Sequence, residues 1–319
     1  MSTQSPSQTT TQTGYITIPT TNHKLYLSTS GPPRLPLENG KLPPAIILES
    51  GLGSSSSEWT VTQRLISHFA RVYSYDRAGY GQSEVSPLPP TAQNRVLELG
   101  RLLDVAGIQP PYILVGQSYG GVLIREFLRV YGKEKVMGMV IIDSGREVNP
   151  LSKGWWELLG GYRLGSVIGL DTNHAYTEEE YEIVKRDEIQ NENTFWIEES
   201  LVKESMEILN AQVPITDQAL GEGRLSVVFG NRSVDFKKVL DFGIENGFGS
   251  VEARLALEKR LEGMERVDEE GQRVHLGLSS QSRFVRATGV AETHCVHYVA
   301  PELVRDEVFW VFSGCIPGL

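Results

Sequence analysis

The sequence PPYILVGQSYGG, residues 110–121, decides the predicted fold. Its residues 112–115 form a short apolar run, which is typical of a β-strand buried on both faces. The pattern Gly-x-Ser-x-Gly comes next, and a helical pattern follows over 120–131. Glycines on both sides of a serine allow a tight turn from strand to helix, which holds the hydroxyl exposed at the end of the strand. We therefore expect Ser118 to be a nucleophile, although a glycine-rich turn with a serine that caps the helix gives the same letters.

Further apolar runs on both sides of this stretch predict the rest of a sheet. Helical patterns at 92–106, 120–131 and 301–312 separate them. Strands that alternate with helices form a parallel sheet with helices on both faces. We therefore predict an α/β fold with a mostly parallel central sheet, preceded by a hairpin over 15–19 and 23–29. The other expected strands are 45–49, 72–75, 136–142, 225–229 and 284–287.

The predicted domains follow from where this alternation stops. Residues 1–14 are rich in Ser, Thr and Gln, and we expect them to form a disordered tail. The core is predicted to comprise 15–147 and 221–319. Between these parts, 148–220 has helical patterns without a strand pattern, which predicts a helical cap over the carboxyl edge of the sheet, where open α/β sheets bind ligands. The charged, partly helical stretch 231–281 is too long for a simple connection, and its place in the fold is left open.

The composition limits the partners and the location of the chain. Its 30 basic and 40 acidic residues give a formal charge of -10, the wrong sign for binding nucleic acid or an anionic membrane. No run approaches the roughly 20 apolar residues of a membrane span. Cys295 and Cys315 are too few for a disulfide framework and the N-terminus has no signal-peptide pattern, so we expect a cytoplasmic protein with free thiols. The expected partner is a small-molecule substrate, and the oligomeric state is not predicted.

No metal or cofactor is expected. His294 and His297 alone do not make a zinc site, and no other Cys or His cluster has metal-ligand spacing. The glycine-containing stretch 76–83, DRAGYGQS, lacks the lysine of a phosphate-binding loop and the spacing of a dinucleotide site. We interpret it as a structural turn beside Ser118.

A serine hydroxyl becomes a good nucleophile when an imidazole takes its proton, so a histidine must lie near Ser118. His294 follows the last predicted strand and precedes the C-terminal helix, which places it on a loop at the carboxyl end of the sheet. We predict His294 as the base. His297 is the alternative, and packing explains it more simply.

An acid must orient that imidazole, and two aspartates suit the role. Asp143 ends the run 136–142, and Asp235 lies further along the chain, so either gives the order Ser, acid, His. We favour Asp143, because the end of a strand holds a side chain more rigidly than a loop does. Asp235 is the alternative acid, followed by Asp241 and Glu292. Each aspartate could instead be a helix cap or a turn residue.

The reaction of a serine with a carbonyl also needs two backbone N–H groups to stabilise the oxyanion. Tyr119, at the start of the helix after Ser118, is expected to supply one of them. The second is expected from the loop SGLG, residues 50–53, which follows the strand 45–49. Leu52 is our candidate, and Gly53 is the next.

Five ordered blocks carry a resemblance to a known family: ESGLGSSSSEW (49–59), YDRAGYGQS (75–83), PPYILVGQSYGG (110–121), VIIDS (140–144) and ETHCVHYVAPELV (292–304). They resemble the α/β-hydrolase superfamily, and in particular its esterase and lactonase-like branch. The resemblance implies that Ser118 is the nucleophile, His294 the base, and Leu52 and Tyr119 the oxyanion donors. Asp143 matches the acid that some relatives carry after the sixth strand.

The chain departs from the pattern of that family in two places. Ser50 and Gly51 stand where many relatives have His-Gly, and Thr293 stands where Gly usually precedes the catalytic histidine. Relatives that attack epoxides or haloalkanes have Asp at the nucleophile position, so Ser118 indicates attack on a carbonyl. We predict a serine hydrolase that cleaves a carboxylic ester or lactone of a small, largely apolar substrate through an acyl-enzyme.

Other chemistry on the same fold is open. The same residues could catalyse acyl transfer, cyclisation or C–C bond chemistry on a biosynthetic intermediate, and a receptor-like ligand-binding protein is a third hypothesis. We expect Trp155, Trp156 and Tyr162 to bind substrate if the cap lines the site. The alternative is that these rings, with Phe195 and Trp196, form the core of the cap itself.

Overall fold

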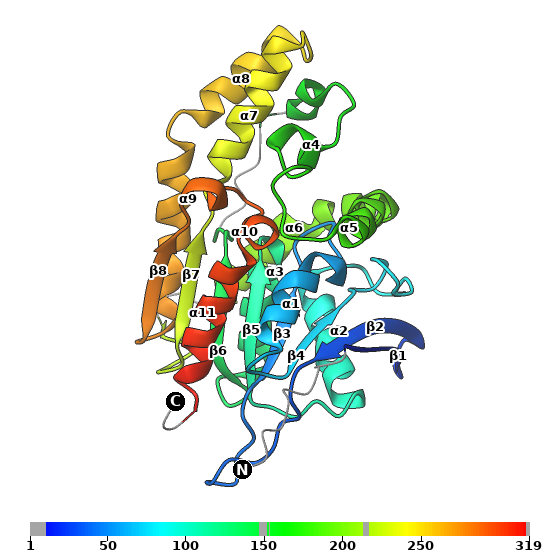
Figure 1. The fold of residues 1–319 in the computed structure, drawn as a ribbon, viewed down its shortest axis with the longest axis vertical. Helices are drawn as coiled ribbons and strands as arrows, with labels where there is room; N and C mark the ends of the chain where they lie inside the picture. Colours follow the sequence, from blue (N-terminus) through cyan, green and yellow to red (C-terminus); the bar gives the residue numbers. More distant parts are fainter. Residues whose placement is uncertain (1–10, 147–151, 153, 213–216, 317–319) are drawn as a thin grey trace, which may run out of the picture.

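The structure is a computed structural model that describes residues 11–316 apart from 147–151, 153 and 213–216. Its described residues form an α/β fold around a central sheet (Figure 1). Its eight strands have the order β1-β2-β4-β3-β5-β6-β7-β8. The first two strands form an antiparallel hairpin, β2 pairs antiparallel with β4, and the remaining neighbours are parallel. The predicted α/β fold with a mostly parallel sheet is confirmed. The strands are β1 (Gln12–Ile18), β2 (His23–Ser30), β3 (Ala45–Glu49), β4 (Val72–Tyr75), β5 (Tyr112–Gln117), β6 (Val136–Ile142), β7 (Leu225–Phe229) and β8 (Ser282–Arg286).

The helices between the strands give the sheet an apolar layer on each face. The α-helices are α1 (Thr60–Ile66), α2 (Ala92–Val105), α3 (Tyr119–Tyr131), α4 (Leu164–Ile168), α5 (Glu178–Gln190), α6 (Glu192–Gln212), α7 (Arg232–Glu245), α8 (Val251–Leu261), α9 (Met264–Arg273), α10 (Val296–Val299) and α11 (Pro301–Ser313). Short 3-10 helices are η1 (Ser56–Trp59), η2 (Trp155–Leu159), η4 (Val274–Leu278) and η5 (Gly289–Ala291).

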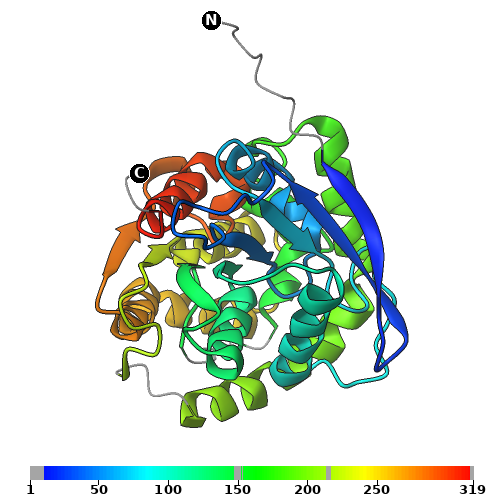
Figure 2. The same ribbon diagram turned by 90° about the horizontal axis from the view of Figure 1, so that it is seen from below.

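Successive residues of β3 show how the two layers form. Ile47 packs in one apolar cluster with residues of α2 and α3, whereas Ile46 and Leu48 pack in another with residues of α1 and α11. Side chains of a strand alternate between the faces of a sheet, so a strand that is apolar throughout must be covered on both sides. Figure 2 shows the helices on the two sides of the sheet. This burial explains why short, uniformly apolar runs became strands.

The region above the sheet is built from two separate segments of the chain. Its apolar core contains Leu158 of η2 and Val184 of α5, together with Phe236 of α7 and Leu257 of α8. The stretch 231–281, which the sequence left unplaced, thus folds mainly as α7, α8 and α9. Helix α7 lies beside α4, and α8 packs against α7 and η2 (Figure 1). We call η2, α4, α5, α7 and α8 the composite cap.

Helix α6 lies in the predicted cap segment and also belongs to the core. Met206 and Leu209 from its second half are buried in the apolar cluster that α2 and α3 form with the sheet. Ser205 of α6 accepts a hydrogen bond from the N–H of Ala92 at the start of α2 (3.1 Å). This helix therefore joins the region above the sheet to the sheet itself.

The N-terminal boundary differs from the prediction of a tail over 1–14. Strand β1 begins at Gln12, and its residues 12–14 pair with residues 27–29 of β2. Residues 12–14 are exposed and none has an apolar side chain, so the composition of this stretch did not indicate the backbone pairing that holds it. Residues 1–10 of the predicted tail lie outside the described residues.

No helix in the part of the chain that the structure describes is both long and apolar enough to cross a membrane. Cys295 and Cys315 are free thiols, as expected, and each is partly buried. Burial and nearby carboxylates raise the pKa of the Cys295 thiol well above its usual value.

Candidate active site

Ser118 lies at the turn between β5 and α3 in a strained conformation. Its φ of 52° and ψ of -120° fall in a region that a residue with a Cβ rarely adopts. The flanking glycines allow this turn, because a Cβ at Gly116 would lie 2.4 Å from the carbonyl oxygen of Gly120. The N–H of Ser118 donates to the carbonyl of Ile142, the last residue of β6 (2.9 Å). Ser118 therefore has the conformation expected for a nucleophile at the carboxyl edge of the sheet.

Asp143 and His294 meet at the same edge. The Nδ1 atom of His294 lies 2.6 Å from Oδ2 of Asp143, which is buried just beyond the end of β6. The other carboxylate oxygen of Asp143 accepts hydrogen bonds from the N–H of Gly230 (2.9 Å) and from Nε2 of Gln272 (2.8 Å). Burial alone would raise the pKa of Asp143, but the hydrogen bonds and the charge of His294 bring it below its usual value. Asp143 is therefore an ionised partner for the imidazole.

Asp235, the alternative acid, contacts the backbone of His294. Its Oδ2 accepts hydrogen bonds from the N–H of His294 (2.7 Å) and from the hydroxyl of Thr293 (2.9 Å). The expectation that Asp235 lies in a loop is wrong, because the residue is in the first turn of α7, which starts directly after β7. Burial raises the pKa of Asp235, and the hydrogen bonds from the histidine loop oppose that shift. In this arrangement Asp143 contacts the imidazole ring of His294, and Asp235 binds the backbone of the loop that carries it.

A further contact fixes the histidine loop to the serine turn. Nε2 of Gln117, the residue before Ser118, donates to the carbonyl of His294 (3.0 Å). Since the N–H of His294 donates to Asp235, both backbone polar groups of His294 have partners. This role of Gln117 cannot be predicted from local sequence, because the contact joins residues far apart in the chain.

The other histidines lie away from this pairing. His297 is buried against the ring of Trp59, and its Nε2 lies 3.3 Å from Oε2 of Glu58. His275 is also buried, with Nε2 3.0 Å from the carbonyl of Ser144. Burial and two nearby arginines lower the pKa of His275 to about 3, so its ring is neutral. The packing interpretation of His297 fits its position.

The loop 50–53 lies against Ser118, where an oxyanion donor is needed. A Cβ at Gly51 would lie 3.5 Å from Cβ of Ser118. Leu52 comes next in this loop, and Tyr119 is the first residue of α3. Leu52 thus follows a residue that lies against Ser118, and Tyr119 follows Ser118 itself; their role as oxyanion donors stays a prediction.

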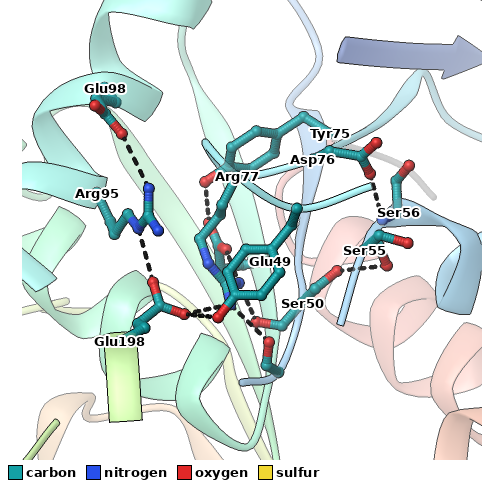
Figure 3. Close-up of polar contacts among 12 residues, drawn as sticks. Glu49, Ser50, Ser55, Ser56, Tyr75, Asp76, Arg77, Arg95, Glu98 and Glu198 are labelled. Atoms are coloured by element: carbon teal, nitrogen blue, oxygen red, sulfur yellow. Dashed lines mark hydrogen bonds and ion pairs between the residues drawn. The ribbon is translucent and has the colours of Figure 1, made fainter. Parts of the chain in front are cut away.

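Side chains on both sides hold this loop, and the sequence analysis did not predict these contacts. The N–H of Gly51 donates to Oε1 of Glu58 (3.1 Å). The guanidinium of Arg77 donates to the carbonyl of Ser50 (2.6 Å) and to that of Gly51 (2.7 Å). Figure 3 shows Arg77 between Glu49 and Glu198, beside Ser50. The turn 76–83 therefore contacts the loop next to Ser118, which agrees with its interpretation as a structural turn there.

Trp155, Trp156 and Tyr162 pack within the composite cap or face solvent. The ring of Trp155 meets Phe236 edge to face, at 5.2 Å between centroids. Tyr162 contacts Phe242 of α7 and the nearby Phe248, and its side chain is more than half exposed. Trp156 is exposed to a similar extent. These contacts favour a role in the cap for the three rings, and substrate binding by them stays a prediction.

Phe195 lies closer to the candidate site. A Cβ at Gly53 would lie only 3.0 Å from Cδ2 of Phe195, so this ring of α6 rests directly on the loop 50–53. The neighbouring Asn191 donates from Nδ2 to the carbonyl of Gly53 (2.9 Å). The start of α6 thus covers the loop. Among the described residues, no group of three or more His, Cys, Asp or Glu side chains could hold a metal ion.

The fold is that of an α/β protein with a mostly parallel sheet, and comparison with known proteins identifies its family. A family model described as the alpha/beta hydrolase fold matches residues 44–185. An "AB hydrolase superfamily protein" of Gibberella zeae is 31% identical over 304 residues, covering 89% of this chain and 90% of that protein. The chain belongs to the α/β-hydrolase family.

Two other similar proteins differ in what they cover. A "Probable transporter efuK" of Hormonema carpetanum is 32% identical over 98% of this chain, but the chain spans only 44% of that protein. The crystal structure of an enol-lactonase from Burkholderia xenovorans matches 94% of this chain and 100% of its own, with a TM-score of 0.57 and 15% identity. At that identity the likeness supports the fold alone.

Proposed function

We propose that this protein is a serine hydrolase that cleaves a carboxylic ester or lactone of a small, largely apolar substrate through an acyl-enzyme. The observation that carries the proposal is the buried, ionised Asp143 bonded to Nδ1 of His294, at the sheet edge where Ser118 is held in a strained turn. This combination gives a serine a base and gives that base an orienting charge.

The proposed reaction begins at Ser118. With Nδ1–H donated to Asp143, the free Nε2 of His294 accepts the proton of the serine hydroxyl as its oxygen attacks the substrate carbonyl. The oxyanion of the tetrahedral intermediate accepts hydrogen bonds from the N–H groups of Leu52 and Tyr119. His294 then protonates the leaving alcohol, and the acyl group stays on Ser118.

Water completes the proposed cycle. His294 takes a proton from a water molecule, whose oxygen attacks the acyl-enzyme, and the imidazolium returns the proton to Ser118 as the acid leaves. In a lactone the leaving alcohol and the acid belong to one molecule, so the product is a hydroxy acid. The enol-lactonase with the same fold is compatible with this substrate class, although its low identity carries no specificity.

The substrate is proposed to be small and apolar because of what covers the loop 50–53. Phe195 presents an aromatic ring there, and Leu52 is an apolar residue of the loop itself. A bulky or charged group near the reacting carbonyl would have to displace that ring. The part of the substrate beside the oxyanion loop should therefore be compact and uncharged.

Three measurements test the proposal together. Purified protein should hydrolyse short aryl esters or simple lactones, and a fluorophosphonate should modify Ser118, as identified by mass spectrometry of the peptide. Hydrolysis in ¹⁸O-labelled water should place the label in the acid product. A product without label would show that water is not the acceptor and would favour acyl transfer or cyclisation. A protein that neither hydrolyses these substrates nor reacts with the fluorophosphonate at Ser118 would overturn the proposal in favour of a ligand-binding protein.

A further inference from the structure

A buried ionic network joins the loop 50–53 to helix α6 (Figure 3). Its charged residues are each no more than 4% exposed: Glu49, Arg77, Arg95, Glu98 and Glu198. Buried charges are unfavourable unless each is paired and hydrogen-bonded, so an arrangement of this kind needs a reason beyond packing. The residues come from β3, the turn after β4, α2 and α6, and the network therefore connects the sheet edge with the region above it.

Arg77 is the member that contacts the loop. Its Nη1 donates to Glu49 (2.9 Å) and to the carbonyl of Ser50 (2.6 Å). Its Nη2 donates to the carbonyl of Gly51 (2.7 Å) and to Oε2 of Glu198 (3.1 Å). One planar guanidinium therefore holds two successive carbonyl groups in fixed directions.

The carbonyl of Gly51 shares a planar peptide unit with the N–H of Leu52. In a trans peptide the C=O and the following N–H point in opposite directions, so fixing one direction fixes the other. The bond from Arg77 to the carbonyl of Gly51 thus orients the N–H of Leu52 away from Arg77. The N–H of Gly51 is held separately by Glu58 (3.1 Å), which prevents rotation of the preceding peptide.

Glu198 sets the position of the guanidinium. Its Oε2 accepts from Arg77 and from the hydroxyl of Tyr80 (2.6 Å), and its Oε1 accepts from Nε of Arg95 (2.7 Å). Burial would raise the pKa of Glu198, but the two arginines outweigh it and lower the pKa below its usual value. An ionised carboxylate from α6 therefore fixes one edge of Arg77, and Glu49 fixes another.

We propose that Arg77 and Glu198 are positioning residues for the oxyanion hole, through which helix α6 controls the direction of the Leu52 N–H. The proposal deepens the proposed function and rests on it. Neither residue is expected to touch substrate. When α6 is seated, Glu198 holds Arg77, Arg77 holds the peptide between Gly51 and Leu52, and the donor points at the oxyanion. When α6 is displaced, the loop loses that restraint.

The test compares two glutamates of the same network. Glu198→Gln removes the charge that holds Arg77, whereas Glu98→Gln removes a similarly buried charge that lies 3.5 Å from Nη1 of Arg95 and 3.7 Å from Nε2 of His23. We expect Glu198→Gln to lower kcat about 10- to 100-fold with KM nearly unchanged, since an oxyanion donor acts mainly in the transition state. Glu98→Gln should stay within about threefold of the wild type.

Amide hydrogen exchange gives a readout that needs no turnover. In Glu198→Gln, exchange of a peptide that contains residues 50–54 should be faster than in the wild type, while the same peptide in Glu98→Gln should match the wild type. If Glu198→Gln does not fold, Tyr80→Phe, which removes one hydrogen bond to the same carboxylate oxygen, should show the same changes at smaller size.

Failure of this proposal and failure of the proposed function give different results. Equal kinetics for the two glutamate variants, or unchanged exchange of 50–54 in Glu198→Gln, would overturn the positioning role while the wild type still hydrolyses esters. A wild type that neither hydrolyses esters nor reacts at Ser118 would overturn the hydrolase, and the loop exchange would still decide whether Glu198 positions the loop. A rise in KM with unchanged kcat would assign Glu198 to substrate binding instead.

Discussion

The carboxyl edge of the sheet and the region above it hold their side chains in different ways. At the edge, Ser118 and Asp143 follow adjacent parallel strands, and backbone bonds fix both: the N–H of Ser118 to Ile142 and the N–H of Asp143 to Val228 (2.7 Å). Above the edge, side chains bind loops of the core. Glu198 of α6 accepts a hydrogen bond from Arg77, and Asn191, just before α6, donates to the carbonyl of Gly53.

This difference separates two tasks. Ser118 and Asp143 lie where the strand ladder sets the backbone, because rigid elements hold a site more precisely than loops do. The loop that carries their partner His294 is held instead by hydrogen bonds to Asp235 and from Gln117. Groups that shape access to the site are joined by side chains that can part without unfolding the sheet. The comparison predicts that substitutions at the edge lower kcat strongly and the free energy of unfolding little. Substitutions in the composite cap should lower the free energy of unfolding strongly and kcat little.

The largest effect is expected from Ser118→Ala. Removal of the nucleophile should lower kcat for an aryl ester by about 10⁶-fold, the scale of a serine knockout in a catalytic triad. The midpoint of denaturant unfolding should not fall, because the substitution removes no contact on which the fold depends. Steady-state kinetics and urea unfolding check both. Residual activity within tenfold of the wild type would show that Ser118 is not the nucleophile.

Asp143→Asn should lower kcat by about 10⁴-fold, because the neutral amide neither holds the imidazole in the correct tautomer nor stabilises its charged form. Asp235→Asn is the matched control, since an amide oxygen can still accept from the N–H of His294, and its loss should be no more than about tenfold. Rates of the two variants on one ester settle the order. The reverse order would make Asp235 the acid.

The pH dependence of stability follows from the same carboxylate. The folded-state pKa of Asp143 is lowered, so its contribution to the free energy of unfolding is present above its ordinary pKa and is lost as the pH falls through the folded value. The wild type should therefore lose more stability on acidification than Asp143→Asn. Urea unfolding at neutral and at strongly acidic pH measures the difference, and parallel losses would contradict it.

In the composite cap, Leu158→Ala should destabilise the protein by about 2–5 kcal/mol, because Leu158 is fully buried and its removal leaves a cavity. Turnover of a small ester should change less than about threefold at a temperature where the variant is folded. Leu255→Ala, at a side chain of α8 that is more than half exposed, is the control and should be within about 0.5 kcal/mol of the wild type. A large loss of kcat in the folded Leu158→Ala protein would break the separation of tasks.

The smallest effect is expected from Phe195→Ala, which tests how α6 shapes access. The ring covers Gly53, and a bulky group would have to displace it. Its removal should therefore lower KM about 10-fold for bulky esters and less for acetate esters. Trp156→Ala should leave KM for both esters unchanged, since that ring is exposed on the cap. Equal changes in both variants would place the substrate against the outer rings instead.

The parts of the site that the sequence predicted are those that local patterns define. Ser118 lies in a turn that its own neighbours force, and Asp143 ends a strand visible as an apolar run. The contacts of Arg77 with Glu198 and of Gln117 with His294 join residues more than a hundred positions apart, and no local pattern records them. The place of the helices over 232–273 has a related cause: their buried apolar residues face a core that they share with η2, α4 and α5, which lie far away in the chain.

The composite cap has a consequence for exchanging parts between relatives. Leu158 and Val184 share one apolar core with Phe236 and Leu257, so each segment buries apolar side chains against the other. A graft of 155–190 from another hydrolase would face side chains of α7 and α8 shaped for the original. A chimera with altered access to the same serine would thus have to carry both segments, and specificity in this architecture should diversify through coordinated change at two distant places in the gene.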